Sequence, residues 1–259
     1  MANLLSKEWQ SIEWVLTDVD DTLTWQGKLP PETLIALANL QQRGIKVVAV
    51  TGACAGWCDH IAQLWPVDAV LGENGAFTLE KTNKGISLTS SIPLSEMRIQ
   101  QEKLKDQVEA ILADYPQVSL TLDQAYRLCE VAIDIGQNCT PVPNEIVEQV
   151  ITKIHQLGAH ATASSIHINA WYGEHSKRNS AFAFLKAQGL TEQDIRGKCC
   201  YVGDSLNDQQ MFEALPLTIG VKNILHYWDK LTHKPNKVMK QPGGYGFAEF
   251  VDLLNHTAT

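Results

Sequence analysis

The chain lacks any long apolar run. Across its 259 residues no segment approaches the roughly 20 uninterrupted apolar residues that a membrane-spanning helix needs. Clusters of lysine and arginine are also missing, and the formal net charge of -8 disfavours binding to nucleic acid or anionic lipid. Residues 1–10 have neither the basic start nor the apolar stretch of a secretion signal. We therefore expect a cytoplasmic protein with no membrane and no nucleic-acid partner.

The six cysteines do not indicate a disulfide framework, because the chain is large and has no secretion signal. Cys54, Cys58 and His60 have a spacing that suggests a metal site, but they lie in a predicted helix without a second ligand pair. Free thiols packed as small apolar groups are the better interpretation. With 44% hydrophobic residues the chain can bury a sizeable core, and its length favours two modest domains.

Apolar strands and amphipathic helices alternate at both ends of the chain. The predicted strands are 14–18, 45–51, 68–72, 199–202 and 217–221, and the predicted helices are 32–43, 56–65, 177–188 and 208–214. The strand 45–51 is continuously apolar, which suits a sheet covered on both faces. This pattern predicts a doubly wound, mostly parallel, Rossmann-like α/β sheet with its site at the carboxyl ends of the strands.

The middle of the chain follows a different pattern. It predicts a hairpin over 77–88, helices over 94–115 and 144–157, and strands over 118–122, 127–135 and 165–171. These elements indicate an α+β domain, with an antiparallel sheet and helices on one face, inserted into the first domain. We place the core at 1–85 and 173–259 and the insertion at 86–172. Hinges near 84–90 and 172–176 would let the inserted domain close over the core.

Three carboxylates are packed into four positions, Asp18, Asp20 and Asp21, at the end of the first strand. Like charges this close repel and lose hydration, so they ionise together only when a cation or hydrogen-bond donors compensate. A bound Mg²⁺ would do so. Taken alone, the stretch is better explained by a solvated, aspartate-rich turn, and the rest of the chain is what favours the metal.

Further polar residues follow other predicted strands at the same edge of the sheet. Thr51-Gly52 offers a hydroxyl and a flexible amide, which together form a small anion cradle, although a threonine before a glycine turn also simply ends a strand. Gly203-Asp204 is a second acidic strand end. Lys177 and Asp208 stand at helix starts, where an ordinary surface lysine and a helix-stabilising acid are the alternatives.

Together these stretches resemble the four motifs of the haloacid dehalogenase superfamily of phosphatases. The motifs read Asp18-Val19-Asp20-Asp21-Thr22, Thr51-Gly52, Lys177, and Gly203-Asp204-Ser205-Leu206-Asn207-Asp208. The insertion, opened by Glu73-Asn74-Gly75-Ala76, is similar to the large α/β cap of the subgroup with the Cof-type sugar phosphatases, sucrose-phosphate phosphatase and phosphomannomutase.

The resemblance implies a role for each motif. Asp18 would attack phosphorus and form an aspartyl-phosphate, and Asp20 would act as general acid and then base. Mg²⁺ would be held by Asp18, Asp20 through its carbonyl, and Asp204. The roles implied for the other residues are phosphate binding by Thr51, Gly52 and Lys177, metal ligation through water or orientation of the lysine by Asp208, and tentative substrate contact at the cap hinge by Asn74.

Three positions depart from the resemblance. The subgroup often continues the second motif as Thr-Gly-Arg, whereas this chain has Ala53, so a substrate contact is missing or moved. Arg178 replaces the glycine that often follows the lysine, and Asp21 replaces a common glycine. In the cap, His167 and Asn169 share one face of a predicted strand, where either substrate contact or exposure to solvent explains them.

These observations predict a Mg²⁺-dependent phosphatase acting on a small phosphorylated metabolite, such as a sugar or glycoside phosphate. A phosphomutase of the same subgroup is the alternative enzyme. A phospho-accepting signalling module also joins strand-end acids to threonine and lysine, but receiver domains lack a domain-sized insertion and the second acidic strand end. Both a monomer and a dimer are compatible with the pattern.

Overall fold

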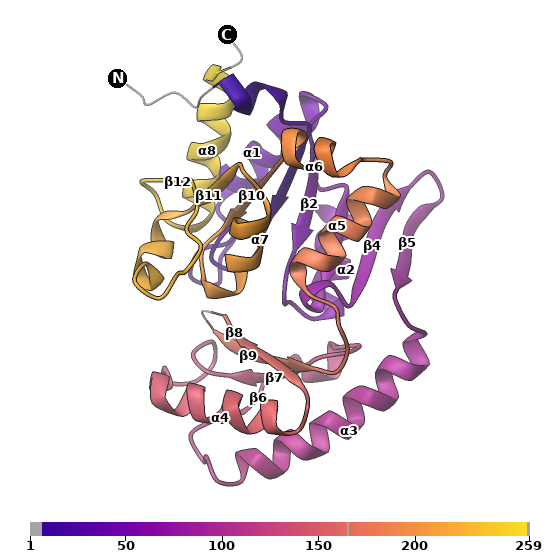
Figure 1. The fold of residues 1–259 in the computed structure, drawn as a ribbon, viewed down its shortest axis with the longest axis vertical. Coiled ribbons are helices and arrows are strands. Elements are labelled where there is room, and N and C mark those ends of the chain that lie inside the picture. The colour runs from indigo at the N-terminus through magenta and orange to yellow at the C-terminus, as the bar shows by residue number, and fades with distance from the viewer. Residues whose placement is uncertain (1–6, 165, 258–259) are drawn as a thin grey trace.

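The computed structural model describes residues 7–164 and 166–257, and it divides into a large core and a smaller cap. Figure 1 shows the core above and the cap below, joined by two crossings of the chain. The core contains an eight-stranded sheet, and the cap contains a separate four-stranded sheet. The predicted α/β core with an inserted α+β cap is confirmed.

The core sheet is parallel except at one edge. Its order is β12-β11-β10-β1-β2-β3-β4-β5, and the β3-β4 and β4-β5 pairs are antiparallel. The strands are β1 (Trp14–Thr17), β2 (Lys46–Val50), β3 (Ala69–Gly72), β4 (Phe77–Thr82), β5 (Gly85–Ser90), β10 (Cys199–Gly203), β11 (Thr218–Gly220) and β12 (Lys237–Val238). Strand β1 lies in the middle, between β2 and β10, so the residues that follow it reach the centre of the sheet's carboxyl edge.

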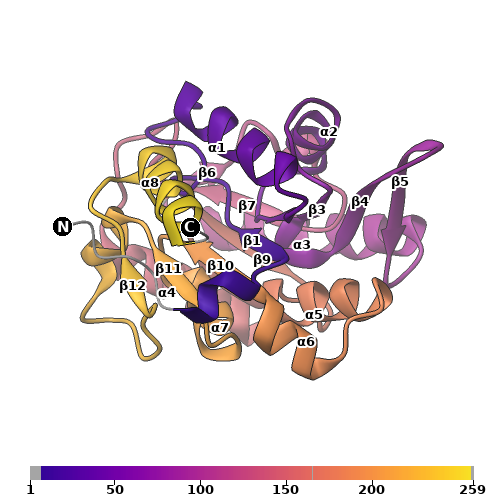
Figure 2. The same cartoon turned by 90° about the horizontal axis from the view of Figure 1, so that it is seen from above.

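Helices cover both faces of the core sheet (Figure 2). One face carries α1 (Pro31–Gln42), α2 (Ala55–Leu64) and α8 (Gly243–Thr257), and the other carries α5 (Lys177–Ala187), α6 (Glu192–Lys198) and α7 (Gln209–Ala214). Neighbouring residues of β1 serve opposite faces, since Val15 belongs to the first hydrophobic cluster and Leu16 to the second. This double cover explains why the central strands are almost purely apolar.

The cap is an antiparallel sheet backed by two helices. Its strands, in the order β6-β7-β9-β8, are β6 (Ser119–Leu120), β7 (Val131–Asp134), β8 (His160–Ala163) and β9 (His167–Trp171). The helices α3 (Leu94–Leu112) and α4 (Asn144–Gln156) lie on the side away from the core (Figure 1). Leu104, Val150 and Ile168 are fully buried in a third hydrophobic cluster between helices and sheet. The other face of the cap sheet therefore faces the core.

Two of the boundaries that differ from the sequence prediction lie where core and cap meet. Strand β5 pairs with β4 along its whole length, from Gly85 opposite Thr82 to Ser90 opposite Phe77. It is thus part of the core sheet, so the chain leaves the core after Ser90 rather than after residue 85. The predicted strand 127–135 forms only over Val131–Asp134, because the amides of residues 128–130 donate to Glu73 and not to a neighbouring strand. Among the described residues, no helix is long and apolar enough to cross a membrane.

His175 lies on the crossing by which the chain returns to the core. Its ring packs against that of Trp171, with centroids 5.3 Å apart, and its Nε2 atom is buried without a hydrogen-bond partner among the described residues. Burial, aided by the charge of His160, lowers the pKa of His175 to about 4. The folded protein therefore holds this imidazole neutral at pH values where the unfolded chain protonates it.

We expect this histidine to cost stability as the pH falls. Between pH 6.5 and 4 the unfolded state binds a proton on His175 that the folded state does not bind. The stability that comes from burying the neutral ring is therefore fully present above pH 6.5 and is lost as the pH falls toward 4. His175→Phe should therefore gain stability relative to the wild type as the pH is lowered, by about 2 kcal/mol at pH 5. Urea unfolding of both proteins at pH 7.5 and pH 5 measures the difference. A gap that stays constant across the two pH values would contradict the assignment.

Candidate active site

Two acidic strand ends meet at the centre of the core sheet. Asp18 follows β1 and Asp204 follows β10, and these parallel strands are paired from Trp14 to Thr17. The amide of Asp18 donates to the carbonyl of Val202, 2.9 Å away, which extends the pairing by one residue. Carboxylate oxygens of Asp18, Asp204 and Asp208 all lie within 4.8 Å of one another, and the three residues are buried. Acidic side chains far apart in the sequence thus share one small space.

Lys177 supplies a buried cation to this cluster. It is the first residue of α5, and its Nζ donates to Asp18 Oδ1 at 2.7 Å and to Asp208 Oδ1 at 2.9 Å. Burial opposes the charge, but Asp18 and Asp208 outweigh it and raise the pKa of Lys177 above its usual range. Burial raises the pKa of the Asp18 carboxyl to about 7, and Lys177 works against that rise. The lysine therefore stays charged and favours the ionised form of Asp18.

Asp208 organises the cluster from behind. Its Oδ1 accepts from Lys177 and from the hydroxyl of Tyr201, at 2.5 Å, and its Oδ2 accepts from the amides of Asp204 and Ser205. Four donors already satisfy both oxygens. The contacts of Asp208 are those of a residue that orients the lysine and the loop after β10. Tyr201 gave no sequence signal, since it reads as one more apolar position in a strand.

The charges at this site fit a divalent cation. Asp18, Asp204 and Asp208 place three buried carboxylates around the single ammonium of Lys177. Burial raises the pKa of Asp204 well above its usual range, and the neighbouring Asp18 and Asp208 raise it further. Asp204 accepts from Thr22 and, at 2.9 Å, from Asn223. These neutral donors do not offset the surplus negative charge. Carboxylate oxygens bind hard divalent cations, so Asp18 and Asp204 are suited to hold one.

Asp20 lies beside the cluster on a tight turn. The carbonyl of Val19 accepts from the amides of Leu23 and Thr24, and Asp21 has a left-handed backbone with φ of 55°. Glycine adopts that conformation without strain and aspartate tolerates it, which explains how Asp21 stands where the superfamily often has glycine. Burial, and then the charge of Asp21, raise the pKa of Asp20 to about 6. A carboxyl of that kind can hold or release a proton near neutral pH.

The Thr51-Gly52 turn follows β2 at the same edge. The Thr51 hydroxyl oxygen accepts from the amide of Ala53 at 3.0 Å, so its own hydrogen is directed elsewhere. The carbonyl of Gly52 accepts from two cap side chains, Arg127 Nη1 at 2.9 Å and Asn169 Nδ2 at 3.0 Å. A Cβ atom at Gly52 would come within 2.4 Å of Asn169 Nδ2. Glycine is needed here because the cap approaches so closely.

Arg127 of the cap places its guanidinium beside Gly52, the residue before Ala53. Position 53 is the one at which the resemblance led us to expect an arginine. The Arg127 side chain is fully buried, although it comes from the cap. Besides Gly52, it donates to both carboxylate oxygens of Asp123 and to Glu130 at 3.5 Å. These contacts leave it bonded to protein on nearly every side. Arg127 therefore holds the Thr51-Gly52 turn in position, and it has little capacity left for a further ligand.

Glu73 and Asn74 attach the cap to the core. Glu73 Oε1 accepts from the amides of Ala55 and Leu128, and its Oε2 accepts from the amides of Cys129 and Glu130. Three of the four donors belong to the cap. Asn74, the predicted substrate contact at the hinge, donates to Glu130 Oε1 at 2.8 Å and is 3% exposed. Substrate contact by Asn74 stays a prediction, and sequence reasoning gave Glu73 no role because that role depends on a segment more than fifty residues away.

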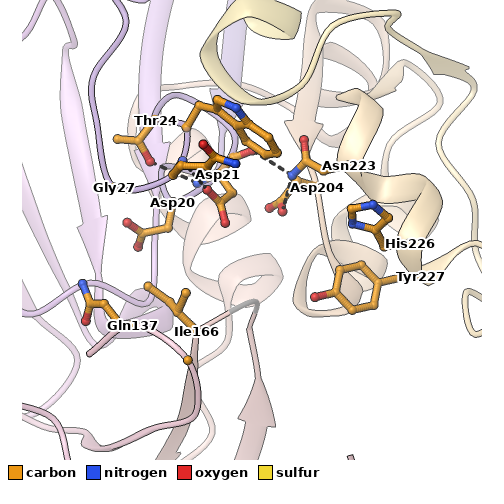
Figure 3. Close-up of a pocket in the computed structure, with 13 residues that line it drawn as sticks. Asp20, Asp21, Thr24, Gly27, Gln137, Ile166, Asp204, Asn223, His226 and Tyr227 are labelled. Carbon is orange, nitrogen blue, oxygen red and sulfur yellow. Dashed lines mark hydrogen bonds between the residues drawn. The ribbon is translucent and has the colours of Figure 1, made fainter. Parts of the chain in front are cut away.

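Two cavities meet at Asp20 and Asp204. The inner cavity, about 10 Å³, lies over Asp18 and is lined from the cap by His167 and Asn169. It has room for about one water molecule, so a phosphate group fits only if these cap side chains move outward. The outer pocket, about 400 Å³, opens beside it (Figure 3). Asp20 and Asp204 line both spaces.

Comparisons with known proteins agree with this architecture. A sequence profile of the haloacid dehalogenase-like hydrolases matches residues 15–125. A phosphoglycolate phosphatase of Methanoculleus marisnigri is 26% identical over 218 residues, covering 82% of this chain and 85% of that protein.

Solved structures show the same fold at low sequence identity. A protein of Thermoplasma acidophilum superposes with a TM-score of 0.73 at 16% identity, covering 94% of this chain and 98% of that one. The sucrose-phosphatase of Synechocystis superposes with a TM-score of 0.66 at 12% identity, covering 95% and 98%. A HAD/COF-like hydrolase of Plasmodium vivax gives 0.67 at 13% identity, covering 97% and 99%. Residues 15–125 are thus similar to the haloacid dehalogenase-like hydrolases, most of the chain is similar to a phosphatase, and the whole chain shares the fold of these solved structures.

Proposed function

We propose that the protein is a Mg²⁺-dependent phosphatase that hydrolyses a small sugar or glycoside phosphate through an aspartyl-phosphate on Asp18. The observation that carries this proposal is the pairing of one Asp18 oxygen with Lys177, beside Asp204 and beneath the cap. The pairing fixes the carboxylate and leaves its other oxygen to act as the nucleophile.

The residues divide the reaction between them. An oxygen of Asp18 forms a bond to phosphorus while the bond from phosphorus to the leaving oxygen breaks, and Asp20 gives its proton to that oxygen. Asp20 then takes a proton from water as the water attacks phosphorus, which releases inorganic phosphate and restores Asp18. The hydroxyl of Thr51, the amide of Gly52 and the ammonium of Lys177 donate to the phosphate oxygens as negative charge spreads over them.

Asp18 and Asp204 would hold Mg²⁺, with the carbonyl of Asp20 as a further oxygen ligand. When bound, Mg²⁺ offsets the charge of the carboxylates and of the phosphate. The three buried carboxylates around one ammonium support this assignment.

Removal of divalent metal is therefore expected to stop the reaction. Treatment with EDTA followed by desalting should lower phosphate release by at least about 100-fold, because the carboxylates at Asp18 and Asp204 would then repel the phosphate. Added Mg²⁺ should restore it, and added K⁺ at equal ionic strength should not.

A panel of phosphorylated sugars and glycosides, assayed for inorganic phosphate, tests the activity itself. Release of phosphate also separates hydrolysis from a mutase reaction, which would return only an isomerised ester. Activity that survives chelation unchanged would exclude the metal. If no panel member yields phosphate in the presence of Mg²⁺, the proposed function is wrong.

A further inference from the structure

We infer that the leaving group of the substrate lies in the outer pocket of Figure 3 and carries no negative charge. This inference rests on the proposed phosphatase function and deepens it. It starts from the position of Asp20, which lines both cavities. The general acid must reach the oxygen that joins phosphorus to the leaving group. With phosphorus over Asp18 in the inner cavity, that oxygen lies next to Asp20 and the rest of the leaving group continues outward.

The outer pocket is the space that can receive it. Of the described pockets, it alone shares lining residues with the inner cavity. Figure 3 shows its walls, with Gln137 and Ile166 from the cap below and Asn223, His226 and Tyr227 from the core to the side. A volume of about 400 Å³ falls within the range of small-molecule sites.

No lysine or arginine is among the described lining residues of this pocket. Its carboxylates are those of Asp21, of Asp20, which enters the reaction protonated, and of Asp204, whose charge Mg²⁺ would offset. The buried cations nearby are already paired, since Lys177 bonds to Asp18 and Asp208 and Arg127 bonds to Asp123. A carboxylate or second phosphate placed here would lie near the Asp21 carboxylate and would find no lysine or arginine to compensate its charge.

The remaining lining groups suit hydroxyls and sugar rings. Gln26 and Gln137 contribute amide side chains, with the Gln137 oxygen bonded to His167, and Trp25 and Tyr227 contribute aromatic rings. Amides can both donate to and accept from hydroxyl groups, and ring faces pack against apolar surface. This set favours a neutral polyol or sugar over an acid such as glycolate, the leaving group named for the Methanoculleus marisnigri relative.

Two pairs of esters test the inference, because the members of each pair differ mainly in charge. Glycerol 3-phosphate is compared with 3-phosphoglycerate, and 2-hydroxyethyl phosphate with 2-phosphoglycolate, at pH 8, where histidine side chains are largely neutral. We expect kcat/KM to be at least about tenfold higher for the neutral member of each pair, as like-charge juxtaposition is costly. If neither member is turned over, their inhibition constants against p-nitrophenyl phosphate make the same comparison.

A charge added to the pocket supplies a second test. Gln137→Lys should shift the ratio of kcat/KM toward the acidic member of each pair by at least about fivefold. The matched control Gln63→Lys adds the same charge on the exposed side of α2 and should leave the ratio as in the wild type.

An acidic member that is hydrolysed, or inhibits, as well as its neutral partner would overturn the inference while leaving the phosphatase function intact. A ratio unmoved by Gln137→Lys would remove the leaving group from this pocket. No phosphate release from any ester, including p-nitrophenyl phosphate with Mg²⁺, would instead refute the proposed function on which the inference depends.

Discussion

Replacing Asp18 by asparagine should lower kcat by at least about 1,000-fold, because an amide of the same shape cannot attack phosphorus. The residue is 3% exposed and its carboxylate oxygen lies 2.7 Å from Lys177 Nζ, and asparagine has nearly the same volume as aspartate. Burial already disfavours the ionised form of Asp18, whose pKa is raised to about 7. We therefore expect the variant to remain folded. Release of inorganic phosphate, with thermal unfolding measured alongside, checks both expectations.

Asp59→Asn is the matched control, since it makes the same change on the exposed face of α2. It should keep the activity of the wild type. Asp18→Asn that still releases phosphate at a rate near that of the control would show that another group receives the phosphoryl group. The proposed intermediate would then have to be abandoned.

Replacing Glu73 by glutamine should detach the cap from the core. Each Glu73 oxygen accepts two backbone amides, at distances from 2.7 to 3.2 Å. The glutamine NH₂ must therefore face two N–H donors whichever way the amide is turned. Buried donors left without an acceptor cost about 1 to 3 kcal/mol each. We expect the free energy of unfolding to fall by about 3 kcal/mol and kcat/KM to fall by at least about tenfold, because the cap positions Gly52 through Arg127.

Amide hydrogen exchange identifies the site of the damage. The amides of Leu128, Cys129 and Glu130 should lose protection in Glu73→Gln, while those of the core strand β1 should keep it. Glu80→Gln is the control, because the Glu80 carboxylate accepts a single exposed bond from Gln188. Unchanged protection over residues 128–130 would mean that Glu73 does not hold the cap.

The sequence was sufficient to predict where the core acids and the lysine would gather. Parallel strands end at a common edge, so an acidic residue directly after β1 and another after β10 had to come close once the alternation was recognised. Asp18, Asp204 and Lys177 meet accordingly. The predicted catalytic roles of these residues stay predictions until they are assayed.

The contacts across the cap interface could not be predicted in the same way. Arg127 had been placed in a strand, where it would alternate between surface and interior, and it instead enters the core as a fully buried side chain. Glu73 is one acid in a turn, and nothing local shows that residues 128–130 will present their amides to it. Such pairings depend on how two domains meet, which neither periodicity nor turn chemistry encodes.

The two cap donors on the Gly52 carbonyl limit how freely this enzyme could exchange parts with its relatives. A chimera that joined this core to a foreign cap would keep the acceptor and lose Arg127 and Asn169 together. It would also remove the cap amides that donate to the Glu73 carboxylate in this protein. A working chimera would therefore have to carry the contacting residues of cap and core together. Its recombination points would lie inside the core, before Glu73 and after Ser176.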